Sequence, residues 1–88
     1  MPLTLTVTDN ANNAGALTTI AGADAATVTV YYMGPRHTAW QNGGSRSGNG
    51  TLTLSIVKGY YWAYAAGTVS GSPAVSLVSP MFPVTAGT

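Results

Sequence analysis

The few side chains that could take part in acid–base chemistry are spread along this 88-residue chain. His37 is its only histidine, and its two carboxylates belong to Asp9 and Asp24. A general acid–base pair needs two titratable groups within hydrogen-bonding reach in a pocket. Both aspartates instead stand in turn-like sequence, where a short carboxylate accepts bonds from backbone N–H groups. We therefore expect the aspartates to stabilise loops, and we expect no catalytic residue.

Motifs for a nucleophile or a phosphate are equally weak. Residues 44–48 resemble the G-x-S-x-G nucleophile elbow only out of register, because Arg46 occupies the central position. The tract 43–50 lacks the Gly-Lys-Ser/Thr ending of a phosphate-binding loop. The chain has no cysteine, so it offers neither a thiolate metal site nor a disulfide. The sequence predicts a protein that is not an enzyme and that carries no metal or cofactor.

Aromatic side chains are the best candidates for binding. Tyr31, Trp40, Trp62 and Tyr64 could form an exposed platform on which a sugar ring stacks. Arg46, in the glycine-rich tract 43–50, is the only other candidate side chain for contact with a partner. The candidate interaction surface is therefore made of four residues: Tyr31, Trp40, Arg46 and Tyr64.

The aromatic run at residues 60–66 must bury one of its two faces if it is a strand. Either Tyr60, Trp62 and Tyr64 face the core, or Tyr61, Ala63 and Ala65 do. A core with few Leu and Ile residues favours large aromatic side chains inside, whereas a sugar platform needs them outside. The sequence leaves open which set is buried.

Charge is scarce in this chain. Its five charged residues make up 6% of the chain and give a net charge of +1, whereas a soluble domain averages about 25% charged residues. The three basic residues, Arg36, Arg46 and Lys58, are far apart, which excludes a nucleic-acid partner and a polybasic membrane anchor. No apolar run is long enough for membrane insertion, and residues 1–7 lack the features of a secretory signal.

Apolar and hydroxyl residues alternate with a period of two in several segments, of which 26–33 is the clearest. No helical period of 3.6 occurs. Strands are expected at 3–7, 16–21 (where a bulge reconciles the broken alternation), 26–33, 51–57, 60–66, 74–78 and 81–85, with a further short candidate at 38–41, and loops at 9–15, 43–50 and 67–73. Pro80 and Pro83 cannot donate to a strand ladder, so the last segment is expected at a sheet edge. The prediction is one all-β domain over residues 1–88, a seven-stranded antiparallel immunoglobulin-like sandwich.

Four segments resemble strands C, E, F and G of fibronectin type III and related immunoglobulin-like domains: residues 26–33, 51–56, 58–65 and 79–85. In that family a tyrosine at the start of strand F makes the tyrosine corner. Ile56, Gly59 and either Tyr60 or Tyr61 match this pattern. Residues 1–25 match only by alternation, since strand B has no core tryptophan. The resemblance implies a fold and no functional site.

Two classes of function fit these observations. The hydroxyl-rich strand faces lack the charges that normally protect sheet edges, which favours self-association. We therefore expect a structural or interaction module that binds protein, including itself, in a virion or surface assembly. The alternative is a carbohydrate-binding accessory module of an extracellular protein, acting through the exposed aromatics. Both place the chain in a virion or at a cell surface, by analogy of fold alone.

Overall fold

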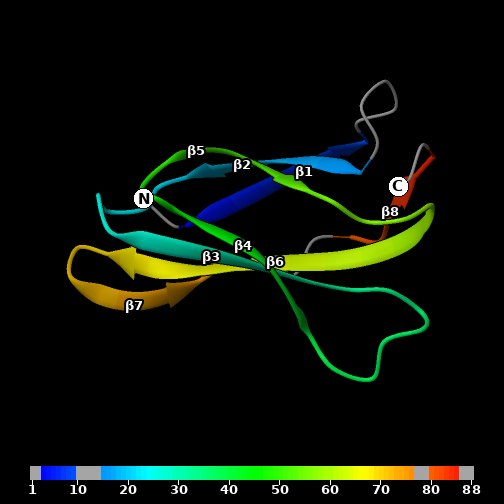
Figure 1. Ribbon diagram of the computed structural model, residues 1–88. Helices are drawn as coiled ribbons and strands as arrows, with labels where there is room; N and C mark the ends of the chain where they lie inside the picture. Colours follow the sequence, from blue (N-terminus) through cyan, green and yellow to red (C-terminus); the bar gives the residue numbers. More distant parts are fainter. Residues whose placement is uncertain (1–2, 10–14, 77–79, 86–88) are drawn as a thin grey trace.

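The computed structural model describes residues 3–9, 15–76 and 80–85, and every regular element in these residues is a strand (Figure 1). The eight strands are β1 (Thr4–Asp9), β2 (Ala16–Ala21), β3 (Thr27–Met33), β4 (Gln41–Ser47), β5 (Gly50–Leu54), β6 (Gly59–Val69), β7 (Ser72–Val75) and β8 (Phe82–Val84). The prediction of an all-β chain is confirmed, and the described residues form eight strands rather than seven.

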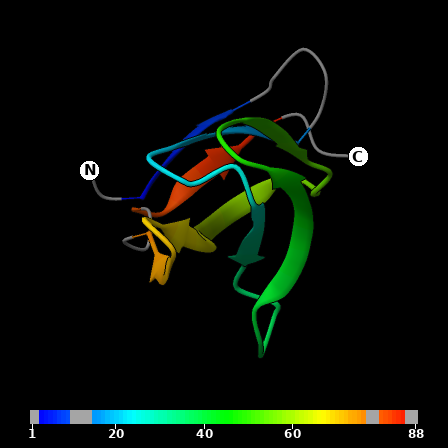
Figure 2. The same ribbon diagram turned by 90° about the vertical axis from the view of Figure 1, so that its left-hand side faces the viewer.

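The strands form two antiparallel sheets that lie one above the other (Figures 1 and 2). One sheet has three strands in the order β1-β2-β5. The other has five, in the order β4-β3-β6-β7, with β8 also paired to β6. Strand β7 pairs with the second half of β6 and β8 with its start. The arrangement is that of an antiparallel β-sandwich.

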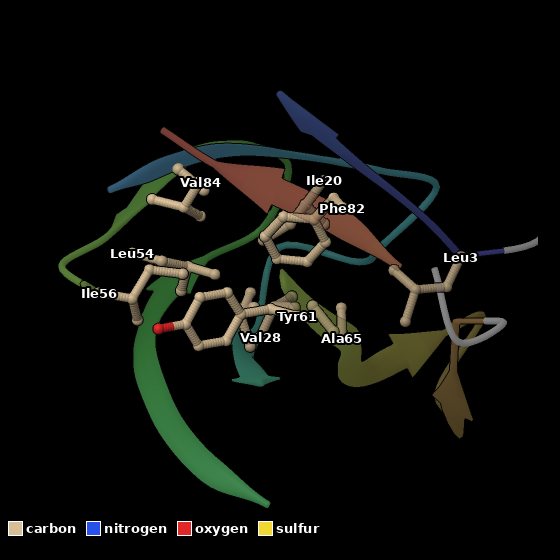
Figure 3. Close-up of a cluster of buried hydrophobic side chains, with 12 residues drawn as sticks. Leu3, Ile20, Val28, Leu54, Ile56, Tyr61, Ala65, Phe82 and Val84 are labelled. Atoms are coloured by element: carbon tan, nitrogen blue, oxygen red, sulfur yellow. The ribbon is translucent and has the colours of Figure 1, made fainter. Parts of the chain in front are cut away.

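The core fills the space between the two sheets (Figure 3). In β3 the alternation predicted from the sequence holds, with Val28 and Val30 fully buried. The inner residues of β6 are a tyrosine followed by two alanines, and β8 adds Phe82 and Val84 from its edge position. The buried hydrophobic residues are Leu3, Ala16, Ile20, Val28, Val30, Leu54, Ile56, Tyr61, Ala63, Ala65, Phe82 and Val84.

Strand β2 alternates without the expected bulge. Its register with β1 and β5 is unbroken, and its inward set is Ala16, Thr18 and Ile20. Thr18 is fully buried, and its hydroxyl donates a 2.6 Å hydrogen bond to the carbonyl oxygen of Leu52. A buried hydroxyl with a partner costs little, so threonine can occupy a core position in this strand.

The glycine-rich tract 43–50 was expected to be a loop, and this prediction was wrong: most of it belongs to β4, while the expected strand at 38–41 lies mainly in the preceding loop. Glycine is needed here because other groups occupy the space of a side chain. A Cβ atom on Gly43 would lie 2.4 Å from Cδ2 of Leu54. Gly44 follows at a bulge against β3 with a φ of +122°, which glycine adopts without strain.

The expected loop at 67–73 is instead a tight hairpin. Strand β6 continues to Val69 and β7 begins at Ser72, so only Ser70 and Gly71 form the turn. Both have positive φ, 51° and 81°, as in the two-residue turns whose twist matches that of paired strands. Strand β7 ends at Val75 rather than Val78, whose position lies outside the described residues. Pro83 does stand in an edge strand, paired with Tyr60 of β6.

Candidate interaction surface

Strand β6 turns its aromatic-rich side away from the core. Tyr61, Ala63 and Ala65 are at most 4% exposed, while Tyr60 and Trp62 are 59% and 37% exposed. Of the two sets that the sequence left open, the buried one is therefore Tyr61, Ala63 and Ala65. The two alanines lie opposite Tyr32 and Val30 of β3, so the core volume at this place is supplied by the neighbouring strand.

Three of the four candidate residues meet on the outside of the five-stranded sheet. Tyr31 of β3 and Tyr64 of β6 are directly opposite in the ladder, and their rings stack with centroids 5.1 Å apart and planes 23° apart. Trp40, from the loop between β3 and β4, packs edge-on against Tyr64 at 4.8 Å and 88°. Trp62 lies two residues before Tyr64 on the same side of β6. We call Tyr31, Trp40, Trp62 and Tyr64 the aromatic face.

The aromatic face is accessible. Trp40 and Trp62 are each 37% exposed, and the two tyrosines are half-buried. In Figure 1 the three-stranded sheet lies on the opposite side of β3 and β6, and the long loop between β3 and β4 projects away from it. None of the described strands covers this side of the sheet. Large aromatic groups in such a position supply contact area for a partner.

Arg46, the fourth candidate, is not part of the aromatic face. It lies opposite the buried Val28 in the ladder, so its side chain leaves β4 on the inner side of the sheet. Its guanidinium donates to the carbonyl oxygens of Thr51 at 3.1 Å and Ser47 at 3.4 Å, and covers Gly50. Arg46 thus connects β4 to β5 across the open edge of the sandwich.

Both aspartates accept backbone N–H groups, as predicted, although Asp9 ends strand β1 and residues 10–14 of the expected loop at 9–15 lie outside the described residues. The Asp24 carboxylate accepts the backbone N–H groups of Ser70 at 2.9 Å and Gly71 at 2.8 Å, and therefore fixes the β6–β7 turn. These bonds to the charged form lower the pKa of Asp24. Asp9 accepts the backbone N–H and the hydroxyl of Thr85, 76 residues further along the chain. Each carboxylate is engaged in holding together distant parts of the backbone.

The single histidine also has a local role. Nδ1 of His37 accepts the backbone N–H of Gly34 at 2.9 Å, and its own backbone N–H donates to the Gly34 carbonyl. Its ring packs edge-on against Tyr32, with centroids 5.7 Å apart. Among the described residues, no group of three or more His, Cys, Asp or Glu side chains is placed to hold a metal ion.

One hollow was not anticipated from the sequence. Residues 34–37 and 57–61 enclose an open pocket of about 360 Å³ at the end of the sandwich where β3 stops and β6 begins. The two segments contribute Arg36, His37 and Lys58. Each has a turn signal, Gly34-Pro35 and Lys58-Gly59, but nothing in the sequence shows that the two turns face one another.

No protein-family model, curated protein or solved structure matches this chain significantly. None of the described residues forms a helix long and apolar enough to cross a membrane.

Proposed function

We propose that this chain is a non-catalytic interaction module that acts by self-association or protein binding, as a component of a virion or surface assembly. The observation that carries the proposal is the aromatic face, where Trp40, Tyr31 and Tyr64 pack together on an uncovered side of the sheet. Tyrosine and tryptophan are enriched at protein interfaces because they combine a large apolar area with a polar atom.

The orientation of the rings favours a protein partner. Tyr31 and Tyr64 each cover one face of the other, and the plane of Trp40 is perpendicular to that of Tyr64. A sugar ring stacks on an open aromatic face, whereas a protein side chain can also pack against ring edges and hydroxyl groups. Stacking within the pair therefore removes part of the area that a sugar would use.

The absence of charge on this side of the sheet favours association between copies. The outward residues of β3 and β6 that surround the stacked pair are Thr29, Met33, Trp62 and Ala66, none of which is charged. Two such faces can meet without repulsion between like charges and without removing a charge from water.

We also propose that the sandwich is of the fibronectin type III kind. With β3, β5, β6 and β8 taken as strands C, E, F and G, the two observed sheets correspond to the A-B-E and C-F-G groupings of immunoglobulin-like folds. The hydroxyl of Tyr61 donates to the carbonyl oxygen of Val57, four residues earlier, in the manner of a tyrosine corner. Domains of this kind serve mainly as spacers or interaction modules, in agreement with the proposed function.

Light scattering coupled to size-exclusion chromatography tests the proposal on the isolated chain. The monomer has a mass of 8.9 kDa. We expect a species of larger mass, whose proportion increases with protein concentration. Trp40→Ser should weaken the association about tenfold, as loss of an interface aromatic does. Met81→Ser, which removes an exposed apolar side chain away from the aromatic face, serves as the matched control. A strict monomer at millimolar concentration would overturn self-association.

Carbohydrate binding is the second candidate, favoured by the exposure of Trp40. Both tryptophans, Trp40 and Trp62, belong to the aromatic face, so the tryptophan fluorescence of the unaltered chain reports on this face. A shift in emission on adding one polysaccharide of a panel, abolished by Tyr64→Ala, would support this function. An unchanged emission across the panel would exclude it.

A further inference from the structure

The pocket formed by residues 34–37 and 57–61 gathers much of the positive charge of the chain. Arg36 and Lys58, two of the three basic residues, stand 22 positions apart in the sequence yet both line this pocket. Of the described residues, none that lines it carries a carboxylate. Its positive charge is therefore not neutralised by its own walls.

The remaining charges of the chain are used elsewhere. Arg46 donates to backbone carbonyl groups between β4 and β5. Asp24 accepts from the β6–β7 turn, and Asp9 accepts from Thr85. In a chain with only five charged residues, the meeting of two cations in one hollow is a specific feature of the tertiary structure.

His37 adds a neutral hydrogen-bond donor to the same pocket. Because Nδ1 accepts the Gly34 N–H, the proton of the neutral ring is on Nε2. The rings of Tyr32 and Tyr61 pack against the imidazole, with centroids 5.7 and 6.5 Å away, and restrict its orientation. The Nε2–H group has no hydrogen-bond partner in the described part of the chain and is free to donate to a ligand.

The rest of the wall is largely apolar. Val57 is 56% exposed although it lines the hollow, and the side chains of Tyr60 and Pro35 stand beside it. An apolar wall next to unneutralised cations suits a ligand with an anionic head and an apolar body. An inorganic anion would leave this wall in contact with water.

We propose that this pocket binds an organic carboxylate. The carboxylate accepts hydrogen bonds from Arg36 and Lys58, and the apolar part of the ligand packs on Val57 and Tyr60. Arginine binds carboxylates through paired N–H donors, while lysine contributes a point charge. The carboxylate could belong to a free small molecule or to the C-terminus of a peptide, since both present the same group.

Chemical-shift titration of the ¹⁵N-labelled chain tests this proposal with N-acetyl-leucine as the probe. We expect the amides of residues 34–37 and 57–61 to shift, with binding in the millimolar range expected of so small a ligand. N-acetyl-leucinamide, which lacks the carboxylate, and inorganic phosphate, which lacks the apolar body, should both bind at least about tenfold more weakly. Equal shifts with the amide would overturn the proposal.

Charge variants separate a specific site from general attraction. Arg36→Gln and Lys58→Gln should each weaken N-acetyl-leucine binding about fivefold to tenfold. Arg46→Gln removes the same charge at a distance from the pocket and should leave the affinity unchanged. An equal loss in all three variants, or no shift at any probe concentration up to about 50 mM, would show that the pocket is not a carboxylate site.

A hexapeptide ending in leucine distinguishes the two sources of the carboxylate. If the pocket takes a peptide C-terminus, the free-acid peptide should bind more tightly than N-acetyl-leucine and its C-terminal amide should not bind. Equal affinity for the peptide and N-acetyl-leucine would assign the site to small molecules. Trp40→Ser should leave these titrations unchanged, so failure of this proposal is distinguishable from failure of the aromatic face as an interface.

Discussion

The hydroxyl of Tyr61 donates a 2.8 Å hydrogen bond to the carbonyl oxygen of Val57, four residues earlier in the chain. The bond joins the start of β6 to the segment that follows β5. The ring of Tyr61 lies in the core against Tyr32 and Phe82. One side chain therefore contributes to the core and fixes the path of the connection between the two sheets.

Replacing Tyr61 by phenylalanine keeps the ring and removes this hydrogen bond. We expect Tyr61→Phe to lower the free energy of unfolding by about 1 kcal/mol, the usual net value of such a bond. Urea unfolding monitored by tryptophan fluorescence measures the change. Tyr60→Phe, at a neighbouring tyrosine that is 59% exposed, should change the free energy by less than about 0.5 kcal/mol. Equal effects of the two variants would contradict the structural role of Tyr61.

The ionisation of Tyr61 makes the free energy of unfolding depend on pH in the alkaline range. Burial raises the pKa of Tyr61 above its ordinary value of 10, Tyr32 adds to the rise, and Arg36 opposes it. The folded state thus keeps a proton that the unfolded chain loses. The contribution to stability is complete below about pH 10 and is lost as the pH rises through the folded pKa. Urea unfolding as a function of pH should show a shallower alkaline loss for Tyr61→Phe than for the original chain.

The ionisation of Asp24 makes the stability of the fold depend on pH in the acid range, with the opposite sign. Hydrogen bonds from Gly71 and Ser70 lower its pKa below the ordinary 3.8. The stability that these bonds provide is present above pH 3.8 and is lost as the pH falls through the lowered pKa. We expect Asp24→Asn to have a lower Tm than the original chain at neutral pH, and this difference to shrink in acid. A constant difference in Tm at every pH would show that the carboxylate charge is unimportant to the turn.

Substitution of Gly43 tests why a glycine-rich tract forms a strand. A methyl group at this position would lie 2.4 Å from Cδ2 of Leu54 and 3.2 Å from Cδ1 of Tyr32. Gly43→Ala should therefore reduce the free energy of unfolding by about 1–3 kcal/mol, the usual cost of overpacking a core. Ser47→Ala, at an exposed position of the same strand, is the matched control and should have a small effect. Wild-type stability of Gly43→Ala would refute this explanation of β4.

Sequence reasoning was most successful where the pattern is local. The alternation in residues 26–33 identified β3 and its buried side, because a period of two is a property of the pleated backbone itself. It was least successful in residues 43–50, where glycine normally indicates a loop. There Gly43 is required by Leu54 of the other sheet and Gly44 by its positive φ at the bulge, and neither requirement leaves a periodic signal in the tract.

Only part of the candidate surface was predicted correctly: three of its four residues meet, and Arg46 does not. Tyr31, Trp40 and Tyr64 come together because β3 and β6 pair in the register that places Tyr31 opposite Tyr64. Arg46 lies apart from them because its side chain leaves β4 on the inner side of the sheet. A shift of one residue in either pairing would exchange these outcomes, and register is decided by contacts between strands rather than within them.

The all-β class, the half-buried strands and the scarcity of charge can all be predicted from consecutive residues, because alternation and composition are local properties. The burial of Tyr61 rather than Trp62 in β6, and the meeting of Arg36 and Lys58 in one pocket, are instead consequences of the tertiary fold. Both depend on which segments lie across from one another when two sheets close on a common core, and side-chain volume across that gap selects the face that fits.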